Sequence, residues 1–112
     1  MKLEDLKTNG GMVSPELVKR SAVWEHDGKK DNIEFFVKRA SFGAVARAYA
    51  EEDRSKSAAL LCECVRLGDK GEEVLTYEQA YSLHAALAAC FLEAVTEVND
   101  LSSPDDDEAP KG

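Results

Sequence analysis

Three cysteines and two histidines are the residues of this 112-residue chain best suited to metal binding or nucleophilic chemistry. Cys62 and Cys64 form half of a metal-binding motif, but zinc sites use two cysteine pairs or a cysteine pair with a histidine pair. His26 and His84 stand far apart in the sequence, without a second pair. We therefore predict no metal and no cofactor. We interpret Cys62 and Cys64 as core residues, which share one face if residues 62–67 form a strand, and Cys90 as a core residue of a helix.

The histidines and carboxylates also form no catalytic pattern. We interpret His26 as a solvated residue at a turn and His84 as a local helix cap, because no nucleophile is indicated beside either. The acids occur in runs, such as Glu51–Asp53 and Asp105–Glu108, which are typical of solvated surfaces. Gly68–Gly71 lacks the residues of a phosphate-binding loop and indicates a turn. We therefore predict that the chain is not an enzyme.

Composition and charge restrict the class of partner. The chain has 22 acidic and 14 basic residues, for a formal net charge of −8, which repels nucleic acid phosphates. Its hydrophobic content of 44% is typical of a globular domain. No apolar run approaches the ~18–20 residues that span a bilayer, and charged residues occupy the place of a signal peptide. The sparse, odd number of cysteines favours a reducing compartment, so we expect an intracellular protein that binds neither nucleic acid nor membrane.

Alternating apolar and polar residues predict an antiparallel β-hairpin over about residues 18–38. Asp27-Gly28 favours a two-residue turn, although a four-residue loop over 27–30 remains open. The two loops differ by an even number of residues, so either one leaves the same side chains on the same face. The face predicted to be buried consists of Ala22, Trp24, Ile33, Phe35 and Val37. Phe36 is predicted to point to the opposite face.

Three helices are indicated by their caps and their hydrophobic spacing. Ser41 is a predicted N-cap, followed by a buried stripe of Phe42, Val45, Ala46 and Tyr49. Residues 76–79 form a capping box that opens a short helix. The longest helix is predicted over about 84–99. Its buried stripe is predicted to contain Leu87, Phe91, Ala94, Val95 and Val98.

The segment between these helices is ambiguous. Residues 57–61 suit a helical turn, and 62–75 suit a second short hairpin that turns at Gly68–Gly71. A continuous helix over 57–67 is the alternative. The elements together predict a small single α+β domain, in which two hairpins are packed by three or four helices. We expect a flexible N-terminal arm at 1–16, the domain at 17–100 and a disordered acidic tail at 101–112.

Several segments in this order are similar to a known family. They read VWEHDGKKDNIEFFVKRASFGAVAR, DRSKSAALL, VRLGDKGEEVLTYEQAYSL and AALAACFLEAVTEVN. Over about residues 13–100, the chain resembles the small tail assembly chaperones of long-tailed bacteriophages. It departs from their pattern where His84-Ala85 replaces an expected Asp-Pro before the last helix.

The resemblance implies a binding function in the host bacterial cytoplasm, without enzymatic activity or cofactor. Such chaperones coat the tape measure protein and keep it soluble until the tail tube polymerises, and they form homo-oligomers. A longer frameshifted form recruits the tail tube protein. Some of the synonymous codons for residues 109–111 permit such a slip, and others do not. A structural tail completion protein of the virion and a general cytosolic adaptor are the alternatives. The candidate partner-binding residues are Phe36, Tyr49, Tyr77 and Tyr81, each of which also suits a core position.

Overall fold

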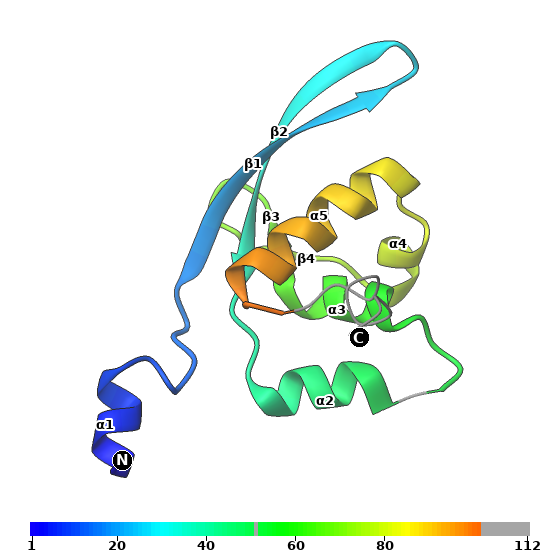
Figure 1. The fold of residues 1–112 in the computed structure, drawn as a ribbon. Helices are drawn as coiled ribbons and strands as arrows, with labels where there is room; N and C mark the ends of the chain where they lie inside the picture. The colour runs from blue at the N-terminus through cyan, green and yellow to red at the C-terminus, as the bar shows by residue number, and fades with distance from the viewer. Residues whose placement is uncertain (51, 102–112) are drawn as a thin grey trace, which may run out of the picture.

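The computed structural model describes residues 1–50 and 52–101, and it has the predicted α+β architecture (Figure 1). Its strands form one antiparallel sheet in the order β1-β2-β3-β4. The strands are β1 (Leu17–His26), β2 (Lys29–Lys38), β3 (Val65–Leu67) and β4 (Glu73–Val74). The helices are α1 (Leu3–Thr8), α2 (Phe42–Ala50), α3 (Lys56–Cys64), α4 (Tyr77–Tyr81) and α5 (Ala85–Val98). The predicted acidic tail, apart from its first residue Leu101, lies outside the described residues.

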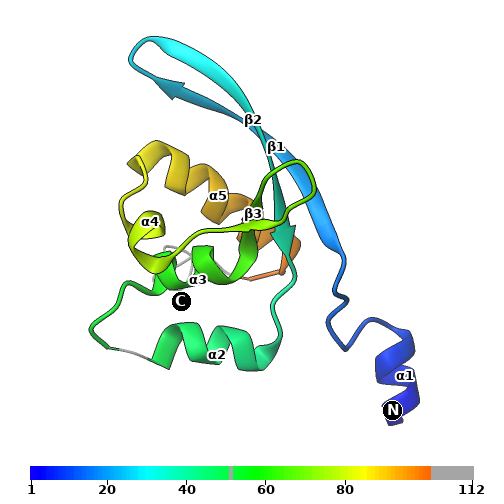
Figure 2. The ribbon, with the colours of Figure 1, turned by 180° about the vertical axis from the view of Figure 1, so that it is seen from behind.

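The shape is elongated because two parts project from the body. Figures 1 and 2 show the turn of the first hairpin at one end of the molecule and α1 at the other. The principal extents are 53 × 39 × 28 Å. Helix α1 lies within the arm predicted at 1–16, and it was not anticipated from the sequence. Among the described residues, no helix is both long enough and apolar enough to cross a membrane.

The first hairpin confirms the two-residue turn. Asp27 and Gly28 have φ values of 50° and 76°, the left-handed conformation that a primed turn requires. Trp24 therefore pairs with Asp31, and Ala22 with Ile33. This register places the predicted apolar residues on one face, as the sequence indicated.

The core lies between that face and helices α3 and α5. The Phe35 and Phe91 rings meet edge to face, with their centres 4.7 Å apart. Val37 and Val95 are fully buried beside them, so the predicted stripe of α5 is confirmed at its centre. The other buried hydrophobic residues in the described part of the chain are Ala58, Leu60, Leu61, Cys64, Val65, Ala80 and Ala94.

The boundary between α3 and β3 corrects both predictions for this segment. Helix α3 begins after the N-cap Ser55 and continues through Cys64, where a strand was expected from residue 62. The helix persists because Ala58, Leu61 and Cys64 recur at helical spacing and are buried. Helix α3 also ends before residue 67, where the alternative continuous helix was predicted to end, because Val65 is extended and pairs with Val37. The second hairpin then turns at Gly68–Gly71, as predicted.

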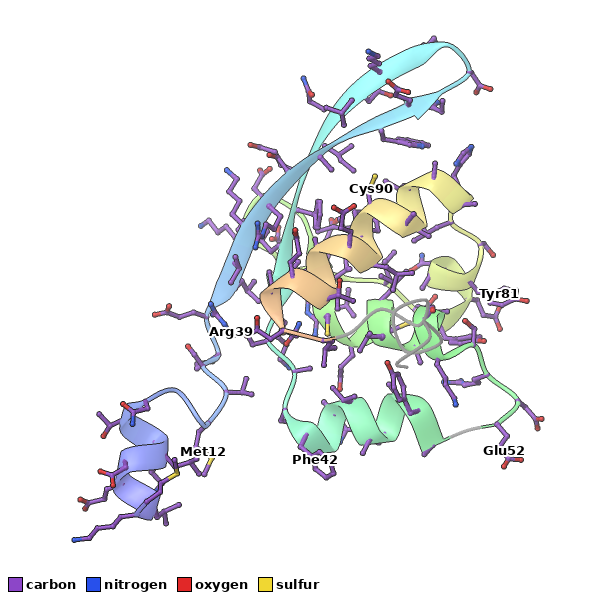
Figure 3. The ribbon with its side chains drawn as sticks, viewed as in Figure 1. Met12, Arg39, Phe42, Glu52, Tyr81 and Cys90 are labelled. Carbon is purple, nitrogen blue, oxygen red and sulfur yellow. The ribbon has the colours of Figure 1, made fainter. Side chains whose placement is uncertain are left out.

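Helix α2 begins where the sequence predicts, but its buried face is different. The Ser41 hydroxyl accepts a hydrogen bond from the Ala44 N–H at 3.2 Å. Of the predicted stripe, Val45 is half-buried, whereas Phe42, Ala46 and Tyr49 are exposed. Phe42 is 89% exposed and points away from the body of the molecule (Figure 3). The predicted stripe is therefore wrong except at Val45: α2 packs with Ala44, Val45 and Ala48 inward and leaves Phe42 in solvent.

Candidate functional site

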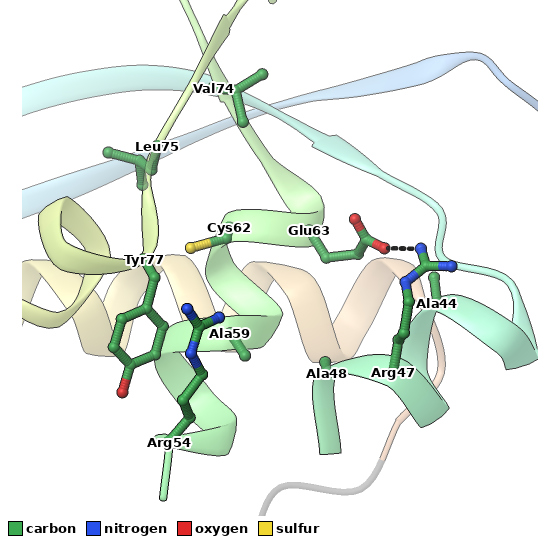
Figure 4. Close-up of a pocket in the computed structure, with 10 residues that line it drawn as sticks. All are labelled: Ala44, Arg47, Ala48, Arg54, Ala59, Cys62, Glu63, Val74, Leu75 and Tyr77. Atoms are coloured by element: carbon green, nitrogen blue, oxygen red, sulfur yellow. Dashed lines mark hydrogen bonds and ion pairs between the residues drawn. The ribbon is translucent and has the colours of Figure 1, made fainter. Parts of the chain in front are cut away.

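A groove opens between α2, α3 and the segment that joins β4 to α4 (Figure 4). Its cavity volume is about 440 Å³, within the range of about 300–1,000 Å³ that is usual for binding pockets. Helix α2 forms one wall, α3 the base, and the β4–α4 segment the other wall. The residues that line it are Ala44, Arg47, Ala48, Arg54, Ala59, Cys62, Glu63, Val74, Leu75 and Tyr77.

Small side chains keep the groove open. Ala44 and Ala48 lie one helical turn apart on α2, and Ala59 lies across from them on α3. Larger residues at these positions would fill the space between the helices. Val74, which is exposed, and Leu75 add apolar surface to the opposite wall. The groove therefore combines small and aliphatic side chains with polar groups in one hollow beside α2 and α3.

Two arginines border this apolar surface. The Arg47 guanidinium donates to Glu63 Oε1 at 2.9 Å, and the Arg47 side chain is 76% exposed. The Arg54 guanidinium carbon lies 4.5 Å from the centre of the Tyr77 ring, a cation–π geometry. The border therefore contains two guanidinium groups, of which Arg47 is paired with the Glu63 carboxylate in the same groove. It suits a partner that carries polar residues beside an apolar surface.

Tyr77 is held in place at the wall of the groove. Its hydroxyl accepts a hydrogen bond from the Ser55 N–H at 2.8 Å, and its ring stacks on Tyr81 with centres 5.9 Å apart. The Thr76–Gln79 capping box is present as predicted, and it starts the helix that carries both tyrosines. Tyr81 is 67% exposed, so the aromatic surface continues from the groove into solvent (Figure 3).

The four predicted partner-binding residues do not form one patch. Tyr77 lines the groove and Tyr81 stacks on it. Tyr49 belongs to the exposed flank of α2, with Lys56 Nζ 5.8 Å from its ring centre. Phe36 lies on the opposite face of the sheet, half-buried against the turn at Gly71. The alanines of the groove were missed, and the spacing of Ala44 and Ala48 by one turn was the signal that could have found them.

The cysteines are separated rather than paired. Because α3 continues through Cys64, Cys62 faces the groove and Cys64 faces the core, which corrects the predicted shared face. Burial raises the pKa of the Cys64 thiol from 9.0 to about 11. Cys90 is half-buried rather than a core residue, and its Sγ lies 3.9 Å from the Val23 carbonyl oxygen. Among residues 1–50 and 52–101, no three His, Cys, Asp or Glu residues could hold a metal ion.

Both histidines make specific contacts with other residues of the chain. The Nδ1 of His84 accepts a hydrogen bond from the Ala86 N–H at 3.1 Å, so its predicted capping role is confirmed. It supplies the helix start where the resemblance led us to expect Asp-Pro. His26 is not solvated as predicted, since its ring stacks on Trp24 with centres 3.8 Å apart and its Nε2 contacts Asp31.

Comparison with known proteins identifies the family to which the chain belongs. No curated protein and no solved structure shows significant similarity to the chain. The protein family described as phage tail assembly chaperone, TAC, matches residues 4–99. This range includes nearly all of α1 and every element of the sheet and of the groove. The chain therefore belongs to the phage tail assembly chaperone family.

Proposed function

We propose that this chaperone binds amphipathic helical segments of the tape measure protein through the α2–α3 groove. It would keep that client soluble in the host bacterial cytoplasm until the tail tube assembles around it. The observation that carries the proposal is the groove beside α2 and α3, where alanines, Val74 and Leu75 lie next to the Arg47–Glu63 ion pair. A helix that lays one apolar face into such a groove is a recurring mode of peptide recognition.

The groove suits side chains from one face of a helix better than a small polar ligand. Its base and its α2 wall contain alanines, which let a partner helix approach closely, and Leu75 and Val74 meet the apolar side chains of that partner. Polar residues at the margin of the client helix would face the Arg47–Glu63 ion pair. The net charge of −8 would keep a client coated with many copies soluble.

The proposal includes the wider role that the resemblance implies. The short product would bind the tape measure protein and assemble as a homo-oligomer. A longer frameshifted product would recruit the tail tube protein. None of these steps makes or breaks a covalent bond, so no enzymatic activity or cofactor is required.

Co-expression with the tape measure protein tests the groove directly. Ala48→Glu places a carboxylate inside the groove, whereas Ala46→Glu places the same group on the exposed side of α2. We expect the wild-type chain and Ala46→Glu to keep the client soluble. Ala48→Glu should lose most of the soluble client, because burying an unpaired carboxylate opposes binding.

The circular dichroism spectrum of each variant shows whether α2 still forms. Failure of the wild-type chain to solubilise the tape measure protein would contradict the client assignment. Loss of binding in Ala46→Glu, with Ala48→Glu unaffected, would keep the client and move its site to the other side of α2.

A further inference from the structure

Strand β1 is a long, free edge of the sheet. It spans ten residues at the end of the order β1-β2-β3-β4 and pairs only with β2 among the described elements (Figure 1). The two-residue turn makes His26 and Lys29 a hydrogen-bonded pair, so the even-numbered residues of β1 bond β2. The odd-numbered residues from Lys19 to Glu25 therefore direct their backbone N–H and C=O groups outward. Proteins rarely leave an edge of this length unpaired, because it recruits other strands.

Two polar atoms on the inner face of β1 lack a partner. Arg20 Nε and Trp24 Nε1 are both buried without a hydrogen bond in the described part of the chain. Buried donors of this kind are uncommon in folded proteins, and each one calls for a physical explanation. They lie on the same strand and face, four residues apart, and Ala22 lies midway between them.

We propose that β1 pairs antiparallel with β1 of a second copy, with a twofold axis at Ala22, to form one continuous sheet. In this register, Lys19 faces Glu25 of the second copy, and symmetry repeats the pair. Arg20 faces Trp24 of the second copy on the inner face, where a guanidinium and an indole attract each other. The strand is thus complementary to itself in charge and in aromatic contact.

The outward backbone groups restrict the choice of register. Odd-numbered residues must face odd-numbered residues, so the register can shift only in steps of two. A shift in one direction places Lys19 opposite Val23, and a shift in the other places Lys19 opposite Asp27 of the turn. Only the register centred on Ala22 pairs Lys19 with Glu25 within the strand. It also aligns every residue of the two copies from Val18 to His26.

Helix α5 presents small side chains near the same axis. Cys90 Sγ lies 3.9 Å from the Val23 carbonyl oxygen, which places the middle of α5 close to β1. A thiol is a weak donor, so a backbone N–H of the second strand can replace this contact. The residues Ala85, Ala86 and Ala89 of this part of the helix are exposed. When two β1 strands pair, their α5 helices approach on the same side of the sheet, and alanines permit the short interaxial distance of about 8–10 Å that this requires.

Charge reversal tests the register by sedimentation or light scattering. Lys19→Glu and Glu25→Lys should each weaken the dimer roughly tenfold, because each puts like charges opposite one another twice. The double variant should restore dimerisation, because positions 19 and 25 then carry opposite charges again. Lys7→Glu, on the distant α1, is the matched control and should leave the dimer unchanged.

The double variant also separates this effect from contacts within the chain. Lys19 lies 3.7 Å from Glu34, and Glu25 lies 3.4 Å from Lys30, as exposed ion pairs. Both pairs stay broken in the double variant, so recovery can come only from a second copy. A double variant as defective as the single ones, or a wild-type chain that is monomeric up to its solubility limit, would overturn the proposal.

Cross-linking locates the axis independently. Ala22→Cys, in a background with Cys62→Ser and Cys90→Ser, should oxidise to a disulfide-linked dimer, because position 22 faces itself in a closely spaced pair. Cys64 can stay, because it is buried. Val18→Cys should not cross-link, because it faces position 26. The absence of a cross-link at position 22 would reject the axis even if the chain dimerises.

Discussion

Helices α5 and α2 have hydrophobic stripes of similar spacing, but they pack very differently. Helix α5 lies against β1, β2 and α3, and Phe91 and Val95 are buried in the core. Helix α2 packs chiefly against α3, and Phe42 at its start is 89% exposed. A helix between several neighbours must bury its large residues, whereas a helix with one neighbour can expose them. The core thus belongs to α5, and the groove exists because α2 is only loosely covered.

The largest expected effect is the difference in stability between a variant of Phe91 on α5 and a variant of Phe42 on α2. Phe91→Ala should lower the free energy of unfolding by about 3–5 kcal/mol, because it leaves a cavity beside Phe35. Phe42→Ala should change it by no more than about 0.5 kcal/mol, because its ring is already in water. Urea denaturation followed by circular dichroism measures both. A large loss of stability in Phe42→Ala would mean that α2 packs with its aromatic side inward.

A second, smaller effect concerns the link between the two helices. The Asn99 side chain accepts from the Ala40 N–H at 2.7 Å and donates to the Lys38 and Val95 carbonyls at 3.4 and 3.0 Å. It ties the end of α5 to the chain just before α2. Asn99→Ala should therefore cost about 1–3 kcal/mol, because it leaves part-buried backbone groups unpaired.

Hydrogen exchange distinguishes this link from a general loss of stability. In Asn99→Ala, the amides of α2 should exchange faster than those of α5 beyond the change in global stability. Asn99→Asp is the matched control, because it keeps the acceptor for Ala40 and loses only the donors. Equal acceleration in α2 and α5 would show that Asn99 does not position α2.

Local signals predicted most of the elements, and the failures have physical causes. Asp27-Gly28, Ser41 and the box at 76–79 act within one turn, so their residue types were sufficient. The extent of α3 depended on whether Val65 would pair with Val37, which lies on a strand far back in the sequence. The sequence between Val37 and Val65 contains no pattern that predicts this pairing.

The groove was harder to predict than the fold because small side chains, which leave space open, create it. Sequence reasoning favours aromatic residues as candidates because they bury large areas in interfaces, and one of them, Tyr77, does line the groove. Ala44, Ala48 and Ala59 make the hollow by being small, and an alanine in a helix usually indicates only helix propensity. Their joint position required the packing of α2 on α3, which no single segment encodes.

The smallest effect extends the comparison to two thiols on α3. Cys64 faces the core, and burial raises its pKa from 9.0 to about 11, whereas Cys62 lines the groove. The unfolded state therefore loses its Cys64 proton first as the pH rises. The contribution of the neutral, buried Cys64 thiol to the free energy of unfolding is therefore fully present below about pH 9. It is lost progressively as the pH rises towards 11. Cys64→Ala should flatten this part of the stability curve, whereas Cys62→Ala should leave most of it.

Urea denaturation between about pH 8 and pH 11 measures that difference, and subtracting the Cys64→Ala curve removes the titration of tyrosines and lysines, which both chains share. A parallel pair of curves would mean that Cys64 is solvated enough to ionise in the folded state. That outcome would place α3 further from the sheet than the core cluster of Cys64, Val65 and Phe35 requires. It would also weaken the distinction between a closed core side and an open groove side of the same helix.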